Sequence, residues 1–109
     1  MVEIALTIDY ILDVRTILTT EPFDTWFAEL RDGQGRARIQ ARIDRAAAGN
    51  LGNCAPVGEG VSEMKIDVGP GYRVYFVQRG LEVIILLAGG DKSKQAKDIA
   101  LAKELARQV

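Results

Sequence analysis

Five side chains in the second half of the sequence have the types needed to act on a phosphodiester. Glu63, Lys65, Arg73 and Tyr75 lie inside runs rich in valine, isoleucine and tyrosine, and Lys92 follows the last such run. Charged residues are seldom placed inside strands without a polar partner or a ligand. The pattern therefore predicts that cations, a carboxylate and a phenol converge on one face of a sheet.

Such a set suits RNA cleavage, because RNA supplies its own nucleophile. The 2′-hydroxyl attacks the adjacent phosphate, and the protein must orient it, neutralise the developing charge and help the leaving oxygen. Arginine suits the charge role through its fork of donors, and a lysine or a carboxylate can move the proton. From spacing alone, a solvated sheet face with ion pairs such as Glu63 with Arg73 is the simpler explanation.

Composition limits the chemistry further. The chain has 109 residues, a net charge of −1, no histidine and one cysteine, Cys54. This leaves no zinc ligand set and no disulfide, so we expect neither a metal nor a cofactor. A net charge near zero means that nucleic-acid binding must rest on a local patch. The longest apolar run, 83–88, is too short to cross a membrane, and we expect a cytoplasmic protein without a signal peptide or membrane contact.

The length fits one domain over residues 1–109, with 1–9 as an extension. Residues 10–18 carry enough β-branched and aromatic residues for a first strand. Thr20 and Pro22 then open a helix whose apolar residues recur at three- and four-residue spacing until the stop at Asp32-Gly33. A second helix is predicted over 35–48, which gives a helical hairpin.

Residues 50–60 read as a loop by composition, and three strands follow over 61–68, 72–77 and 81–88. The turns between them are Gly69-Pro70-Gly71 and Arg79-Gly80, and the break at 89–93 lacks the spacing of a nucleotide-binding loop. Alternation turns Tyr72, Val74 and Phe76 toward the hairpin, and it leaves Lys65, Arg73 and Tyr75 on an open face. The last strand is apolar throughout, which indicates neighbours on both sides, including the first strand.

A last helix is predicted over 94–107, with Ile99, Ala102, Leu105 and Ala106 as its apolar stripe. The fold class is therefore α+β, with a single, mostly antiparallel four-stranded sheet backed by the helical hairpin, plus the C-terminal helix.

The second helix also carries a row of arginines. Arg38, Arg42 and Arg45 are spaced by four and three residues and so share a helix face. A solvated face explains this spacing as well as a contact surface for phosphates or for an acidic partner does.

Four segments closely resemble one toxin family: PFDTWFAELRD, RARIQARIDRAAAGNLGN, PVGEGVSEMKIDVGPGYRVYF and LLAGGDKSKQAKDIALAKELA. Taken in order, they resemble the HigB-like addiction-module killer proteins, a branch of the RelE/ParE toxin superfamily of type II toxin–antitoxin systems. The resemblance spans about residues 12–107. It implies a RelE-like fold, ribosome-dependent cleavage of mRNA that inhibits translation, and a tightly bound antitoxin through which alone operator DNA is contacted.

The resemblance also implies roles for individual residues. Arg73 matches the arginine that contacts the scissile phosphate, Lys65 matches a basic residue of the second strand, and Lys92 matches the basic residue after the last one. These three are the expected catalytic residues. Contact with RNA or the ribosome is expected from Arg38, Arg42, Arg45, Tyr75 and Lys94.

The sequence departs from the family pattern at the groups that move protons. Glu63 stands near a lysine of the family, and the C-terminal tyrosine has no match, because Gln95 and Asp98 occupy that region. ParE-like members of the superfamily inhibit DNA gyrase without cleaving RNA, so the fold alone does not choose between these activities. A non-enzymatic gyrase inhibitor, and a module that acts only in a DNA-bound autoregulatory complex, remain as alternatives.

Overall fold

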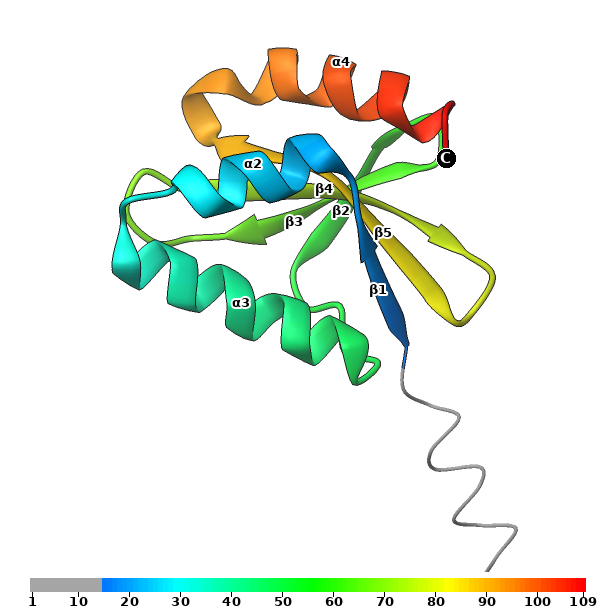
Figure 1. Cartoon of the computed structure of the whole chain (residues 1–109), viewed down its shortest axis with the longest axis horizontal. Helices are drawn as coiled ribbons and strands as arrows, with labels where there is room; N and C mark the ends of the chain where they lie inside the picture. Colours follow the sequence, from blue (N-terminus) through cyan, green and yellow to red (C-terminus); the bar gives the residue numbers. More distant parts are fainter. Residues whose placement is uncertain (1–14) are drawn as a thin grey trace, which may run out of the picture.

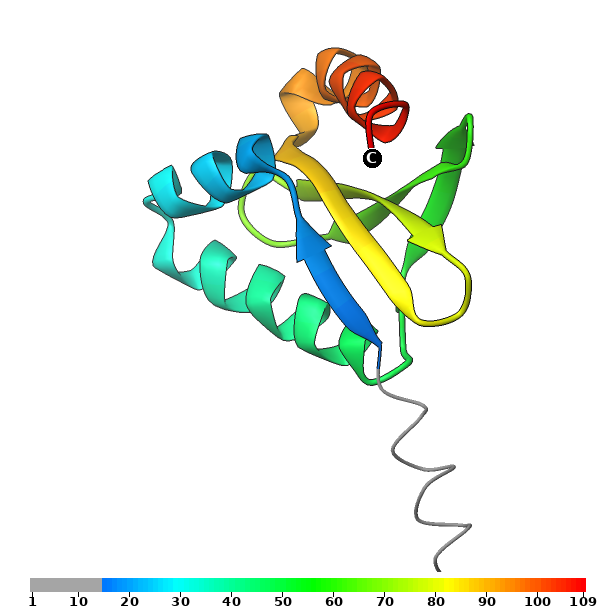
Figure 2. The same cartoon turned by 45° about the vertical axis from the view of Figure 1, so that its right-hand side comes forward.

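The computed structural model describes residues 15–109, so the predictions for residues 1–14 lie outside the described part of the chain. It shows an α+β fold in which a mixed five-stranded sheet separates two helices from a third (Figures 1 and 2). The fold class is as predicted, and the sheet has one strand more than predicted.

The strands follow the order β1-β5-β4-β3-β2 across the sheet. Only β1 and β5 are parallel, and the other neighbours are antiparallel. The predicted pairing of the first and last strands is confirmed, and β5 lies inside the sheet between β1 and β4, as predicted. The bounds are β1 Thr16–Thr19, β2 Cys54–Gly58, β3 Val61–Ile66, β4 Tyr72–Arg79 and β5 Val83–Asp91.

The additional strand, β2, lies in the segment 50–60 that was predicted to be a loop. It pairs with β3 through Cys54, Ala55 and Pro56 and is interrupted by an irregularity between Pro56 and Gly58. Proline is tolerated in an edge strand because one side of the ladder makes no hydrogen bonds. The composition of residues 50–60 therefore did not exclude a strand, and pairing with β3 makes Cys54–Gly58 a strand.

Strand β5 continues through the glycines that were predicted to end it. Gly89 pairs with Val74, Gly90 with Arg73 and Asp91 with Tyr72. A Cβ at Gly89 would collide with the ring of Trp26, and one at Gly90 would collide with the carboxylate of Asp98. These two glycines thus mark close approaches to opposite faces of the sheet and not a turn.

Helices α2 (Glu21–Glu29) and α3 (Gly33–Ala47) form the predicted hairpin. The Thr20 hydroxyl accepts from the Phe23 N–H at 3.2 Å, which confirms the predicted cap. Asp32, predicted to stop the first helix, instead begins α3 by accepting from the Gly35 N–H. The hairpin packs on Tyr72, Val74 and Phe76, as alternation predicted.

Helix α4 (Gln95–Ala106), preceded by the short 3₁₀ turn η1 (Lys92–Lys94), covers the opposite face (Figure 1). Its predicted stripe packs against Val61, Tyr75, Val77 and neighbouring residues of β5. The face predicted to be open is therefore covered, because the stripe that defines the helix must be buried somewhere. None of the helices within residues 15–109 is long and apolar enough to span a membrane.

Candidate active site on the α4 face of the sheet

The charged residues singled out in the sequence meet where β3, β4 and β5 run side by side. Arg73 on β4 lies directly opposite Lys65 on β3 and Gly90 on β5. The Lys92 N–H donates to the Gly71 carbonyl at 2.7 Å, which holds this lysine beside the start of β4. A Cβ at Gly71 would lie 3.7 Å from Lys92 Cβ and 4.0 Å from Arg73 Nη1. Lys65, Arg73 and the main chain of Lys92 thus lie at the same end of the sheet.

Glu63 lies in the centre of this group of cations. Its Oε1 is 3.9 Å from Lys65 Nζ and 3.9 Å from Arg73 Nε. These contacts are ion pairs too long to be hydrogen bonds. Gln95 at the start of α4 donates to Oε2 at 2.8 Å. The buried carboxylate is thus hydrogen-bonded by the helix that covers it and faces two cations.

Arg73 keeps an unused donor in this arrangement. The residue is only 7% exposed, and its Nη1 donates to the Tyr72 carbonyl at 3.1 Å and lies 3.8 Å from Asp67 Oδ1. Its buried Nε has no hydrogen-bond partner among the described residues. Lys65 is one-third exposed, and Lys92 and Lys94 are exposed. The cluster therefore combines one enclosed guanidinium with ammonium groups at the surface.

Tyr75 was predicted to lie on an open face, and this prediction is wrong. The residue is fully buried beneath α4. Burial, with the nearby carboxylates of Glu63 and Asp98, raises the pKa of Tyr75 to about 12. Its hydroxyl has no hydrogen-bond partner within residues 15–109, so it is a protonated phenol enclosed beneath α4 and not a stacking surface for RNA bases.

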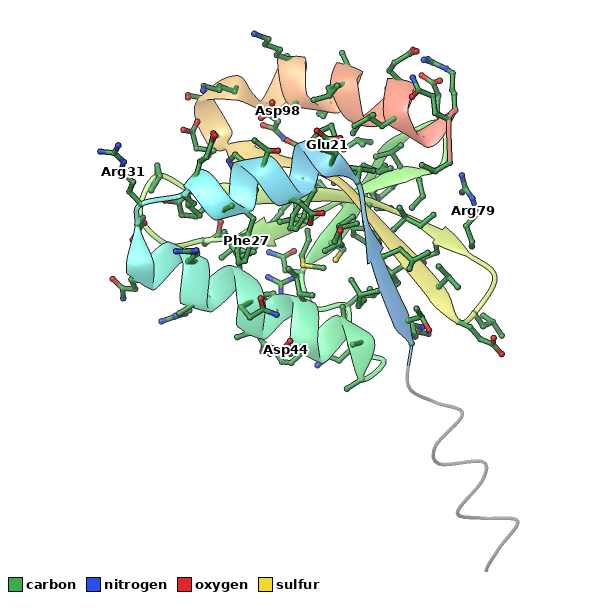
Figure 3. All side chains as sticks on the ribbon, in the orientation of Figure 1. Glu21, Phe27, Arg31, Asp44, Arg79 and Asp98 are labelled. Carbon is green, nitrogen blue, oxygen red and sulfur yellow. The ribbon has the colours of Figure 1, made fainter. Side chains whose placement is uncertain are left out.

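Asp98 is part of the same cluster, although no role was predicted for it from the sequence. Its buried Oδ2 has no hydrogen-bond partner within the described residues, and burial raises the pKa of its carboxyl. Asp98 projects from the first turns of α4 (Figure 3). A signal was present: positions 95, 98 and 102 recur at three- and four-residue spacing with the buried Ala102, which places Gln95 and Asp98 on the sheet-facing side.

The three arginines predicted to share a face of α3 differ in exposure. Arg42 is buried, and its guanidinium donates to the carbonyls of Lys65, Leu51 and Asn53. The predicted RNA contact by Arg42 is therefore wrong, because its donors hold the loop before β2 against the end of β3. Arg38 and Arg45 are exposed, as a contact surface requires.

Asp67 connects the two groups of cations. It approaches Arg73 Nη1 at 3.8 Å and also lines a pocket of about 120 Å³ with Arg38 and Arg45. The arginines of α3 and the cluster under α4 thus lie near the same end of β3. An extended polyanion could contact both.

The chemistry available is that of cations and carboxylates. No group of three Cys, Asp or Glu side chains placed to hold a metal ion occurs within residues 15–109. The residues present can orient and neutralise a phosphate and accept or donate a proton.

No protein-family model matches the chain. A protein of Haemophilus influenzae, described only as uncharacterized, is 46% identical over 93 residues, which are 85% of this chain and 94% of that protein. At this identity and coverage, the chain belongs to the same family as the H. influenzae protein.

Proposed function

We propose that this protein is the toxin of a bacterial type II toxin–antitoxin module, with a RelE-like fold, and that it cleaves mRNA on the ribosome. The observation that carries the proposal is the pairing of Lys65 and Arg73 with Glu63 beside the start of β4, where the Lys92 main chain is also held. The buried Arg73 Nε lies 3.9 Å from Glu63 and makes no hydrogen bond within residues 15–109, so it can still donate to a phosphate oxygen.

Arg73 has the role of stabilising the phosphate. As the 2′-hydroxyl attacks, negative charge grows on the equatorial oxygens, and a guanidinium donor already in place favours that state over the ground state. Burial strengthens the interaction, because the surrounding protein screens charge less than water does. A phosphate oxygen gives the unused Nε a partner.

Proton transfer falls to Glu63 and Lys92. Within residues 15–109, Glu63 is the one carboxylate in ion-pair range of both Lys65 and Arg73, so it can accept the 2′-hydroxyl proton beside the phosphate. The exposed Lys92 can donate to the leaving oxygen. Tyr75 takes no proton, since its pKa of about 12 keeps the phenol protonated.

Helix α4 limits access to this site. The hydrogen bond from Gln95 ties its first turn to Glu63, and Arg73 is enclosed beneath it. The substrate therefore reaches Arg73 only when this turn moves aside. Arg38, Arg45 and Lys94 remain exposed and contact ribosomal RNA, whose phosphates supply the counter-charge.

Replacing Arg73 tests the proposal. Expression of wild-type protein should arrest growth and yield cleaved transcripts, and Arg73→Ala should lower cleavage by at least about 100-fold, the scale of losing one transition-state donor. Arg79→Ala, an exposed arginine of the same strand, is the matched control and should remain active. Circular dichroism and thermal unfolding of Arg73→Ala establish that it folds. A folded Arg73→Ala protein with full cleavage activity would show that the site is misplaced.

A non-enzymatic inhibitor of DNA gyrase is the second candidate. The burial of Arg73 and its pairing with Glu63 favour it, because a structural ion pair has the same appearance. A supercoiling assay run beside a map of mRNA ends in cells separates the two. Cleaved transcripts with normal supercoiling eliminate the inhibitor, whereas inhibited supercoiling with intact transcripts eliminates the nuclease.

A further inference from the structure

An apolar groove lies beside the edge strand β1, on the face of the sheet opposite the candidate active site. It measures about 340 Å³ and is lined by residues of β1, α2, α3 and β5. Ile17 and Thr19 come from β1, Phe27 from α2 and Ile43 from α3. Figure 3 shows Phe27 extending from α2 toward α3. The helical hairpin thus leaves part of the edge strand uncovered, and we call this surface the β1 groove.

The main chain of β1 offers hydrogen bonds along the same groove. The N–H groups of Thr16 and Thr20 donate to Glu82 and Leu86 carbonyls on the β5 side, at 2.6 and 3.1 Å. Because main-chain groups alternate in direction along a strand, those of Ile17 and Thr19 point away from β5. Within residues 15–109, no strand pairs with this outer edge of β1. An added strand would find both donors and acceptors there.

Two carboxylates flank the apolar floor of the groove. Asp24 on α2 and Asp44 on α3 both line it and are exposed. Gln40 donates to Asp44 at 2.9 Å, and within the described residues no lysine or arginine pairs with either carboxylate. The groove therefore has an apolar floor and a negative rim.

We propose that the β1 groove is a docking site for an extended segment of a partner protein that turns both apolar and cationic side chains toward the groove. Such a segment pairs its main chain with Ile17 and Thr19, turns an apolar side chain onto Phe27 and Ile43, and places lysine or arginine beside Asp24 and Asp44. These side chains are two residues apart in the segment, because every second side chain of a strand faces the same side.

Two other occupants fit the charges less well. Residues 1–14 carry three carboxylates and no lysine or arginine, so they would add negative charge beside Asp24 and Asp44. A second copy that paired edge to edge at β1 would bring two sets of these helix carboxylates close together, and like charges repel. A cationic partner removes the repulsion in both cases.

A designed peptide tests the surface without reference to the protein's activity. We expect the peptide KTITKT, whose two lysines and isoleucine share one face of an extended strand, to shift the amide resonances of Ile17 and Thr19 when titrated into isotopically labelled full-length protein. The acidic counterpart ETITET should not shift them. In the Asp24→Lys/Asp44→Lys protein the affinity for KTITKT should fall at least tenfold. The matched control, Glu29→Lys/Glu104→Lys, changes two exposed carboxylates outside the groove and should bind as the wild type does.

Several outcomes would overturn the proposal. Equal binding of both peptides would show that Asp24 and Asp44 do not select a cationic segment. Equal loss of affinity in both double variants would show that net charge alone acts. Nuclear Overhauser contacts from residues 1–14 into the groove would identify the chain's own segment as the occupant. A dimer by sedimentation that dissociates in the Asp24→Lys/Asp44→Lys protein would identify a second copy.

Under the proposed function, the antitoxin is the natural source of the segment, and only this identification rests on that function. Co-purification of the neighbouring gene's product with both double variants separates the two ideas. Retention by the control and at least tenfold weaker retention by Asp24→Lys/Asp44→Lys supports the antitoxin as occupant. Equal retention by both places the antitoxin elsewhere and leaves RNA cleavage untouched. Loss of activity in Arg73→Ala, conversely, says nothing about the groove.

Discussion

The two faces of the sheet each pack an apolar cluster, the larger one on the α2–α3 side, but they treat polar groups differently. On the α2–α3 face, the Tyr72 hydroxyl donates to Asp32 at 2.7 Å, and that carboxylate also caps α3. On the α4 face, Arg73, Tyr75 and Asp98 each keep a buried polar atom that has no hydrogen-bond partner within residues 15–109. An unpaired buried polar group costs roughly 1–3 kcal/mol. The first face is thus built for stability, whereas the second retains costs that a ligand can offset.

The two adjacent glycines of β5 should show the largest contrast between the faces. Gly89→Ala forces a methyl group against the rigid ring of Trp26, and we expect a loss of about 1–3 kcal/mol in the free energy of unfolding. For Gly90→Ala the nearest atoms are those of the Asp98 carboxylate, which can rotate away, so its cost should stay below about 1 kcal/mol. Urea unfolding measures both.

A second substitution sharpens this contrast. In an Asp98→Ala background the cost of Gly90→Ala should disappear, because the carboxylate nearest to it is gone, while the cost of Gly89→Ala should persist. Equal costs for the two glycines in both backgrounds would contradict the assignment of Gly89 to the α2 side and Gly90 to the α4 side.

The two tyrosines of β4 provide the next comparison. Tyr72→Phe removes the hydrogen bond to Asp32 and should cost about 1–2 kcal/mol. Tyr75→Phe removes a hydroxyl that has no partner and should change stability by less than about 0.5 kcal/mol, or increase it. Thermal unfolding of the two variants under one condition decides the matter. A larger loss from Tyr75→Phe would mean that its hydroxyl is hydrogen-bonded in solution.

The smallest effect should be the pH dependence introduced by Asp98. Burial raises the native pKa of this carboxyl above 3.8, so the native state binds its proton more tightly than the unfolded state does. Stability from this group is then full below pH 3.8 and is lost as the pH rises through the native pKa. The wild type should therefore lose stability relative to Asp98→Asn over that range, by less than about 1 kcal/mol. A difference independent of pH would place the carboxyl in water.

Much of the fold could be predicted because it rests on local patterns. Thr20 and Pro22 define the start of α2, and alternation along β4 correctly separated Tyr72, Val74 and Phe76 from Arg73 and Tyr75. The meeting of Lys65 with Arg73 also followed from alternation, since paired strands place directly opposite residues on one face.

Other features depended on contacts between distant segments. Strand β2 forms because β3 offers an edge to pair with, although its own composition is that of a loop. Gly89 and Gly90 lie within a strand because Trp26 and Asp98, far away in the sequence, need the space of the missing side chains. No local pattern around these glycines contains that information.

The sequence by itself determined which residues share a face, because the periods of helix and strand are properties of the backbone. Only the tertiary structure decided what covers each face. Helix α4 encloses Arg73 and Tyr75. Arg42 is buried because its guanidinium donates to three main-chain carbonyls, whereas the other two arginines of the same helix face are exposed. Burial and hydrogen-bond partners arise from packing between elements, so a side chain's exposure could not be deduced from its type and spacing.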